Sequence, residues 1–282
     1  MKSKERRSII RKAVFPIAGV GLRMRPISRV VQKELLPIGT KAMIHFAVQE
    51  AIDSGIEEIH FLMRKNQRHD YFVPETEGAS EPHNSSDSDG VRSTTMLLRQ
   101  ASFSYHVLPA GVGGLGAALL AAKGLISLGH EPFALVLFDD FVDAKKPCLR
   151  QIIEAYESVR ADVFAVTPIP RNEIPQFGVV RCHPFEHGIA RVLAAVEKPD
   201  HRIITGRANG IVGRYILTPR IFEVLRQCVR KGVRNSNELT PALARFIHEG
   251  AQGGLWGDEI TPNMMASGRF WLYDGVGELV GV

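Results

Sequence analysis

The stretch Ala13-Val-Phe-Pro-Ile-Ala-Gly-Val-Gly-Leu-Arg-Met-Arg-Pro26, followed by Gln32-Lys-Glu-Leu-Leu-Pro37, decides the fold of this chain. It begins with the short apolar run typical of a strand that is buried on both faces. Two glycines follow, Gly19 and Gly21, which allow the backbone to turn sharply and to present its N–H groups to an anion. Several cations come next: Arg23, Arg25, Arg29 and Lys33. The stretch therefore predicts a strand that leads into a phosphate-binding turn.

Two common phosphate-binding motifs do not fit this turn. The P-loop motif needs a Lys followed by Ser or Thr after its second glycine, and the stretch lacks that pair. The dinucleotide-binding motif needs a third small residue where this chain has Met24, and Pro26 would interrupt the helix that should begin there. Two glycines and some arginines also occur in plain surface turns, so the remaining sequence blocks have to decide.

The segment Gly19–Pro37 resembles the signature of the sugar-1-phosphate nucleotidyltransferases, and especially of the bacterial UTP–glucose-1-phosphate uridylyltransferases. Further blocks of that family recur in the same order: Gly114-Leu-Gly116, Val136-Leu-Phe-Asp-Asp140, Lys146-Pro-Cys-Leu149, Phe177-Gly-Val179, Val196-Glu-Lys-Pro199, Ile211-Val-Gly-Arg-Tyr-Ile-Leu217 and Leu239-Thr240. The likeness extends from Lys12 to about Gly275. An ordered set of blocks is far more specific than any one of them.

Length and composition fit such a protein. The 282 residues, 45% of them hydrophobic, suffice for one large α/β domain or two small ones. The 35 basic and 30 acidic residues leave a formal charge of +5, and the basic side chains gather in the N-terminal tail and the turn, which favours small anionic substrates over nucleic acid. The sequence has no apolar run long enough for a membrane span and no secretory signal. We therefore expect a cytoplasmic protein without a membrane partner, and leave homo-oligomerisation open.

Strand-like and helix-like runs alternate along the chain. The strand-like runs are 13–18, 58–63, 103–108, 133–138, 162–167, 179–182, 192–196 and 211–217, and the helical runs are 42–54, 115–128, 148–160, 219–230 and 241–249. The alternation predicts a Rossmann-like α/β fold of three layers, a mainly parallel (mixed) sheet with helices on both faces. Thr218 and Thr240 are expected to cap helices, and Asp258 and Glu259 to lie in a solvated loop.

The resemblance implies one nucleotidyltransferase domain over residues 1–282. Within it, residues 12–145 would mainly bind the nucleotide, and 146–282 would form a smaller lobe that mainly binds the sugar. The polar segment 74–95 has few large apolar residues to bury, so we expect a mobile insertion there.

The resemblance also implies the reaction and the residues that perform it. A sugar-1-phosphate, most simply glucose-1-phosphate, would attack the α-phosphorus of a nucleoside triphosphate, most simply UTP, to give a nucleotide sugar and pyrophosphate with Mg²⁺ as cofactor. The implied residues are catalytic Arg23 and Lys33; nucleotide-binding Ala18, Gly19, Gly21, Gly114 and Asp139; sugar-phosphate-binding Gly178, Glu197, Lys198 and Gly213; and metal-binding Asp139 and Asp274.

Structural alternatives remain open for several of these residues. Asp139 or Asp140 could merely cap the next element, Lys33 could form a surface charge pair with Glu34, and Asp274 could lie in an exposed turn.

Departures from the family pattern affect the base and the sugar more than the reaction class. Where the family reads the base with a glutamine, this chain has Pro109, which has no side-chain hydrogen-bonding group. The turn has Leu22 for Thr, and Asn235-Ser-Asn-Glu-Leu-Thr240 stands where the family has Asp-Glu-Ile-Gln-Leu-Thr, so the two carboxylates at the start of that segment are lost. The alternatives are a related enzyme with another base or another sugar or cyclitol phosphate, and a non-catalytic relative that binds a nucleotide sugar.

Overall fold

The computed structural model describes residues 10–67, 70–72, 89–126, 128, 130–142, 144–186, 188–204, 208–248, 256–259 and 270–272. Asp274 lies outside these residues, as does most of the segment 74–95. In the part of the chain that is described, no helix has the length and apolar character needed to cross a membrane.

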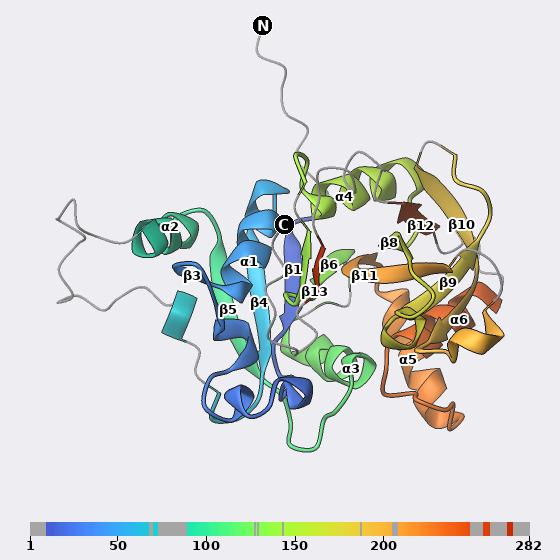
Figure 1. Cartoon of the computed structure of the whole chain (residues 1–282), viewed down its shortest axis with the longest axis horizontal. Helices are drawn as coiled ribbons and strands as arrows, with labels where there is room; N and C mark the ends of the chain where they lie inside the picture. The colour runs from blue at the N-terminus through green and yellow to red at the C-terminus, as the bar shows by residue number, and fades with distance from the viewer. Residues whose placement is uncertain are drawn as a thin grey trace, which may run out of the picture.

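The described residues form a central sheet of nine strands in the order β5-β4-β1-β6-β11-β8-β12-β10-β9 (Figure 1). The strands are β1 (Lys12–Pro16), β4 (Glu58–Met63), β5 (Ser102–Val107), β6 (Phe133–Val136), β8 (Val163–Ile169), β9 (Gly178–Cys182), β10 (Ile189–Glu197), β11 (Ala208–Leu217) and β12 (Trp256–Glu259). Two small ribbons accompany the sheet: β2 (Pro37–Ile38) with β3 (Lys41–Ala42), and β7 (Asp140–Val142) with β13 (Phe270–Leu272).

The sheet is mixed, as predicted, and its parallel pairs are concentrated in the first half of the chain. β5, β4, β1 and β6 are joined by parallel pairings. β11 runs antiparallel to both β6 and β8, and β10 runs antiparallel to β9 and β12. Because β11 lies directly beside β6, strands from the two halves of the chain share one continuous sheet.

Helices cover both faces of the sheet, which gives the predicted three layers. Alternate residues of β1 point to opposite faces, so Ala13 and Phe15 belong to one apolar cluster and Val14 to another. The first cluster includes buried residues of α1 (Met43–Asp53), α2 (Asp89–Leu98) and α4 (Cys148–Val159). The second includes buried residues of α3 (Leu115–Leu125), α5 (Arg220–Arg230) and α6 (Thr240–His248).

The two threonines expected to cap helices have other roles. The Thr218 hydroxyl donates to the Asp162 carboxylate over 3.1 Å, and no side chain caps the start of α5. Thr240 is the first residue of α6, and its hydroxyl donates to Glu197 over 2.5 Å. Both predictions were wrong because a carboxylate that is largely removed from water needs a donor more than an exposed helix end does.

Two other segments also differ from expectation. Asp258 and Glu259 lie in β12, between β8 and β10, and not in a solvated loop, because strands on both sides supply backbone partners that local composition does not reveal. Residues 89–95 of the polar segment belong to α2, where Ser93 Oγ lies 2.9 Å from Nε2 of the buried His45 on α1. The segment 74–95 has no periodic pattern of apolar residues from which this helix could be predicted.

Candidate active site

The glycine-containing turn follows β1 at the carboxyl end of the strand, where ligands bind in sheets of this type. It includes the predicted Ala18, Gly19 and Gly21. Gly21 has a φ of +60°, a left-handed conformation that suits glycine, and its carbonyl accepts a 2.7 Å hydrogen bond from Ser28 Oγ. A Cβ atom on Gly19 would meet nothing within 4 Å, so the backbone there is open to a ligand.

Hydrogen bonds between buried polar groups support this turn. Glu34 is 2% exposed and accepts hydrogen bonds from Gln67 Nε2 and, over 2.7 Å, from Gln32 Nε2. Gln67 Nε2 also donates to the Ile17 carbonyl over 2.7 Å, at the point where the chain leaves β1. Glu34 therefore faces inward, and the suggested surface charge pair with Lys33 is not formed.

Lys33 and Asp139 meet above the end of the sheet, although 106 positions separate them in the sequence. The Lys33 ammonium donates to Asp139 Oδ2 and lies 5.8 Å from the centre of the Phe138 ring. The Lys33 side chain is 18% exposed and that of Asp139 is 35% exposed, so the pair remains accessible to a ligand. The structure thus brings together the predicted phosphate-binding lysine and the predicted metal-binding carboxylate.

Asp140, the neighbour of Asp139, has an internal role. Its Oδ2 atom accepts a 2.7 Å hydrogen bond from the Gly213 N–H, while the Gly213 carbonyl accepts one of 2.8 Å from the Leu137 N–H. Burial and the nearby Asp139 charge raise the pKa of Asp140 to about 6. Asp140 therefore ties its loop to β11, whereas the Asp139 carboxylate bonds to a side chain that a ligand can replace.

The donor set suits a small divalent cation bound together with a substrate. Among the residues that the structure describes, no three or more His, Cys, Asp or Glu side chains gather into a metal-binding group. A cation such as Mg²⁺ often takes only one or two carboxylates and completes its shell with phosphate oxygens and water. The Asp139 side chain is 35% exposed, so its carboxylate is available as one such ligand.

Three of the four predicted sugar-phosphate residues, Gly178, Glu197 and Lys198, lie together, whereas Gly213 contacts Leu137 and Asp140. Glu197 ends β10, and one of its oxygens accepts from Thr240 while the other lies 3.4 Å from Lys198 Nζ. Lys198 has a φ of +43°, which interrupts the alternation of side chains along the strand. The Lys198 ammonium can therefore reach the carboxylate of the preceding residue, Glu197. A Cβ atom on Gly178 would lie 2.9 Å from Thr240 Oγ1, so only glycine leaves room for this arrangement.

Acidic side chains from both halves of the chain influence Tyr215 on β11. Tyr215 on β11 is buried, and burial raises its pKa, with further increases from the negative charges of Asp140, Glu197 and Asp139, in that order. These carboxylates come from loops and strands of both halves of the chain. Tyr215 therefore lies within electrostatic range of acidic groups from both halves of the chain.

The second glycine turn has an unusual lining. Gly114 precedes α3 with a φ of +89°, and the Asn237 carboxamide donates to the Gly113 carbonyl over 3.3 Å. Glu238 accepts a 3.3 Å hydrogen bond from the Leu115 N–H. Pro109 is exposed, and no side chain from Leu108 to Ala122 carries a hydrogen-bonding group. Side chains of this segment therefore cannot distinguish one nucleobase from another by hydrogen bonding.

Two predicted residues are placed only in part or not at all. The backbone of Arg23 lies in a short 3-10 turn, Leu22–Met24, directly after the glycines. Asp274 falls outside the described residues, so its role as a second metal ligand stays a prediction.

Sequence reasoning missed the hydrogen bond from Thr240 to Glu197 and the buried ion pair between Arg214 and Glu50. Arg214 did carry a signal, because an arginine in the middle of an apolar strand is rarely buried without a partner.

The chain matches the family model for nucleotidyl transferases over residues 12–258. It is 34% identical to a UTP–glucose-1-phosphate uridylyltransferase of Staphylococcus epidermidis, over 84% of this chain and 81% of that protein. It is 32% identical to the protein of the same name from Pseudomonas aeruginosa, over 86% of each. A crystal structure of UDP-glucose pyrophosphorylase complexed with UDP-glucose superposes with a TM-score of 0.79 at 29% identity, covering 94% of both chains. Together with the geometry of the site, this shows that the chain belongs to the nucleotidyl transferase family.

Proposed function

We propose that this chain joins UTP and glucose-1-phosphate to give UDP-glucose and pyrophosphate, with Mg²⁺ as cofactor. The observation that carries the proposal is the meeting of Lys33 and Asp139 beside the glycine turn after β1. Relatives named for this activity are similar over most of the chain. The division into a nucleotide-binding half, 12–145, and a sugar-binding half, 146–282, and the cytoplasmic location are parts of the same proposal.

Transfer of a nucleotidyl group requires two anions to approach each other in line. Catalysis of such a reaction consists mostly of positioning and of compensating negative charge. Backbone N–H groups at Ala18, Gly19 and Gly21 would bind the triphosphate, and the Lys33 and Arg23 cations would offset its charge. Asp139 would hold Mg²⁺, which when bound neutralises phosphate oxygens. Lys33 would exchange its bond to Asp139 for bonds to phosphate, because both partners offer negatively charged oxygen acceptors to the ammonium.

The second group of residues would hold the attacking substrate. The Glu197 carboxylate can accept hydrogen bonds from sugar hydroxyls, and the Lys198 ammonium suits the charge of a phosphate monoester. Thr240 occupies one Glu197 oxygen and so fixes the direction in which the rest of the carboxylate points. Gly178 and Gly213, which have no side chain, would let the backbone approach the sugar closely.

One observation favours a second candidate, a related transferase that uses another base or another sugar or cyclitol phosphate. The segment Leu108–Ala122 offers no hydrogen-bonding side chain. In that case recognition of the base would rest on backbone groups and on residues from elsewhere, such as Asn237, which already contacts the turn.

Pyrophosphate release tests both candidates. The protein is incubated with Mg²⁺, each nucleoside triphosphate in turn, and glucose-1-phosphate or another sugar or cyclitol phosphate. Release with UTP and glucose-1-phosphate supports the first candidate, and release with a different base or sugar supports the second. Binding of UDP-glucose without turnover in any combination would instead indicate a non-catalytic relative.

The metal assignment has its own test. Asp139→Asn should lose most turnover while keeping the wild-type circular dichroism spectrum, because the amide keeps the shape of the side chain and removes its charge. Full activity of this variant over a range of Mg²⁺ concentrations would overturn the role of Asp139.

A further inference from the structure

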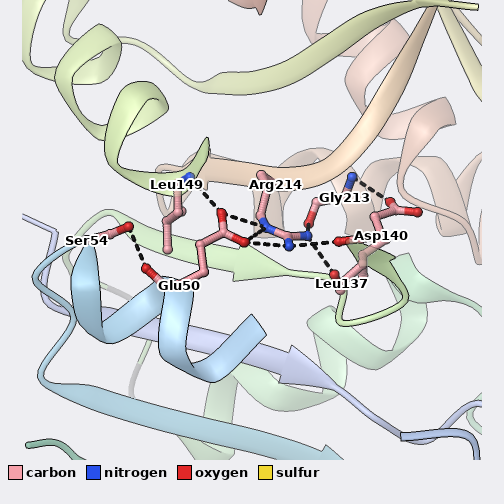
Figure 2. A network of polar contacts seen from close by, with 7 residues as sticks. All are labelled: Glu50, Ser54, Leu137, Asp140, Leu149, Gly213 and Arg214. Atoms are coloured by element: carbon pink, nitrogen blue, oxygen red, sulfur yellow. Dashed lines mark hydrogen bonds and ion pairs between the residues drawn. The ribbon is translucent and has the colours of Figure 1, made fainter. Parts of the chain in front are cut away.

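Arg214 and Glu50 form a buried ion pair beside the loop that carries Asp139. The Arg214 side chain on β11 is 1% exposed, and that of Glu50 on α1 is 10% exposed. Arg214 Nε lies 3.1 Å from each Glu50 oxygen, and Arg214 Nη2 donates to Glu50 Oε2 over 2.7 Å. Glu50 Oε1 also accepts a 2.8 Å hydrogen bond from the Leu149 N–H in the first turn of α4 (Figure 2).

The other side of the guanidinium contacts the loop that carries Asp139. Nη1 donates to the Leu137 carbonyl over 2.7 Å and Nη2 to the Asp140 carbonyl over 2.8 Å. The neighbouring Gly213 bonds to the same two residues through its own N–H and carbonyl. Asp139 is thereby bracketed by hydrogen bonds on both sides, as Figure 2 shows for Leu137 and Asp140. We call residues Leu137–Asp140 the aspartate loop.

Stability alone does not account for this pair. Removing two charges from water costs free energy, and well-packed apolar residues of similar volume often stabilise a fold as well or better. Apolar residues, however, cannot bond to the two loop carbonyls. A lysine could keep the charge, but its single ammonium cannot reach a carboxylate and two carbonyls from one rigid plane. The arrangement of the guanidinium donors is therefore suited to holding the backbone of the aspartate loop in place.

We propose that Arg214, oriented by Glu50, is a positioning residue that fixes the aspartate loop so that the Asp139 carboxylate faces Lys33 and the phosphates. The inference rests on the proposed function, because it assumes that Asp139 binds the catalytic metal. Arg214 itself would not contact the substrate.

The test compares Arg214→Lys with the wild-type protein by two independent readouts. The first is hydrogen exchange of the ligand-free protein, which reports the order of the peptide spanning residues 137–142 without any metal or substrate. The second is steady-state kinetics with UTP and glucose-1-phosphate at several Mg²⁺ concentrations. Ile59→Ala is the control, because Ile59 is fully buried on β4 and its loss destabilises the fold away from the loop.

Arg214→Lys should exchange faster at residues 137–142 than elsewhere. Its kcat should fall by about 10- to 100-fold and its Mg²⁺ requirement should rise, which is the usual effect of losing a group that orients a metal ligand. The KM for glucose-1-phosphate should change by less than about 3-fold, because the sugar contacts are untouched. Ile59→Ala should lower the melting temperature without either local effect.

The proposal is overturned if Arg214→Lys exchanges at residues 137–142 like the wild type, or if Ile59→Ala reproduces its exchange pattern and its loss of kcat. Should Arg214→Lys not fold, Glu50→Gln decides by the same criteria, since the amide can still accept from Arg214 but no longer carries the charge. If the wild-type protein turns over no substrate, the proposed function fails, and the exchange experiment still reports whether Arg214 orders the loop.

Discussion

Replacing Thr240 by Val tests the proposed role of Glu197 in binding the sugar. The substitution keeps the shape of the side chain and removes the hydroxyl that donates to Glu197 Oε2 over 2.5 Å. Thr240 is 5% exposed and the Glu197 side chain 15%, so water cannot readily replace the lost donor. A hydrogen bond to a charged group contributes about 1.5–3 kcal/mol, and each 1.4 kcal/mol is a factor of ten. The expected loss in kcat/KM for glucose-1-phosphate is therefore about 10- to 100-fold.

The assay measures pyrophosphate release at saturating UTP while glucose-1-phosphate is varied, and then the reverse. The KM for UTP should stay near the wild-type value, because Thr240 bonds to Glu197, whose proposed partner is the sugar. Thr240→Ser retains the hydroxyl and is the matched control; it should recover activity to within about 3-fold. The reasoning is refuted if the Val variant keeps wild-type kcat/KM, or if the Ser variant is as impaired as the Val variant.

Three further predictions follow from the same geometry. Lys33→Ala should reduce kcat by about 100-fold, in the range expected for loss of one transition-state donor, and a change in UTP affinity alone would contradict that role. Gly213→Ala would bring a methyl group to 2.5 Å from Leu137 Cβ and should lower both kcat and the melting temperature. The control is Gly124→Ala in α3, where an added Cβ meets nothing within 4 Å, and it should leave the stability unchanged or increase it. Burial raises the pKa of Asp162 from 3.8 to about 6, so the stability that the protonated carboxyl contributes is lost as pH rises through that interval. The free energy of unfolding of Asp162→Asn should therefore increase relative to that of the wild type by up to about 3 kcal/mol between pH 4 and pH 7. Urea unfolding at both pH values measures this difference, and no increase would show that the carboxyl titrates normally.

Sequence patterns predicted the parts of this protein that depend on local order. β4 was predicted with its bounds, Glu58–Met63, because an apolar run between turn residues reads clearly as a buried strand. Asp139 was predicted at the end of β6 and Lys33 in the segment after the glycine turn, and the structure brings these two side chains together. The resemblance carried by the order of the motifs was sufficient for this, although only Asp139 closely follows a strand and Lys33 lies in a short 3-10 helix, Lys33–Leu35.

The residues that hold the site in place could not be predicted in the same way. Glu50 and Arg214 are 164 positions apart, and Glu197 and Thr240 are 43 apart. No spacing rule connects such pairs, since their contact depends on how β11 and α6 pack against other elements. Thr240 was misread for this reason: its position before a proline suggested a helix cap, and only the fold shows that a carboxylate lies beside it.

The place of β11 in the sheet bears on whether the nucleotide-binding half could exist as a separate protein. A fragment ending at residue 145 would lack β11, so the apolar strand β6 would become an open edge available to other chains. The same cut would remove Arg214 and the start of α4, which hold the Glu50 carboxylate in the complete chain. Expressing the halves apart should thus yield insoluble material, whereas mixing them during refolding could restore a complete molecule.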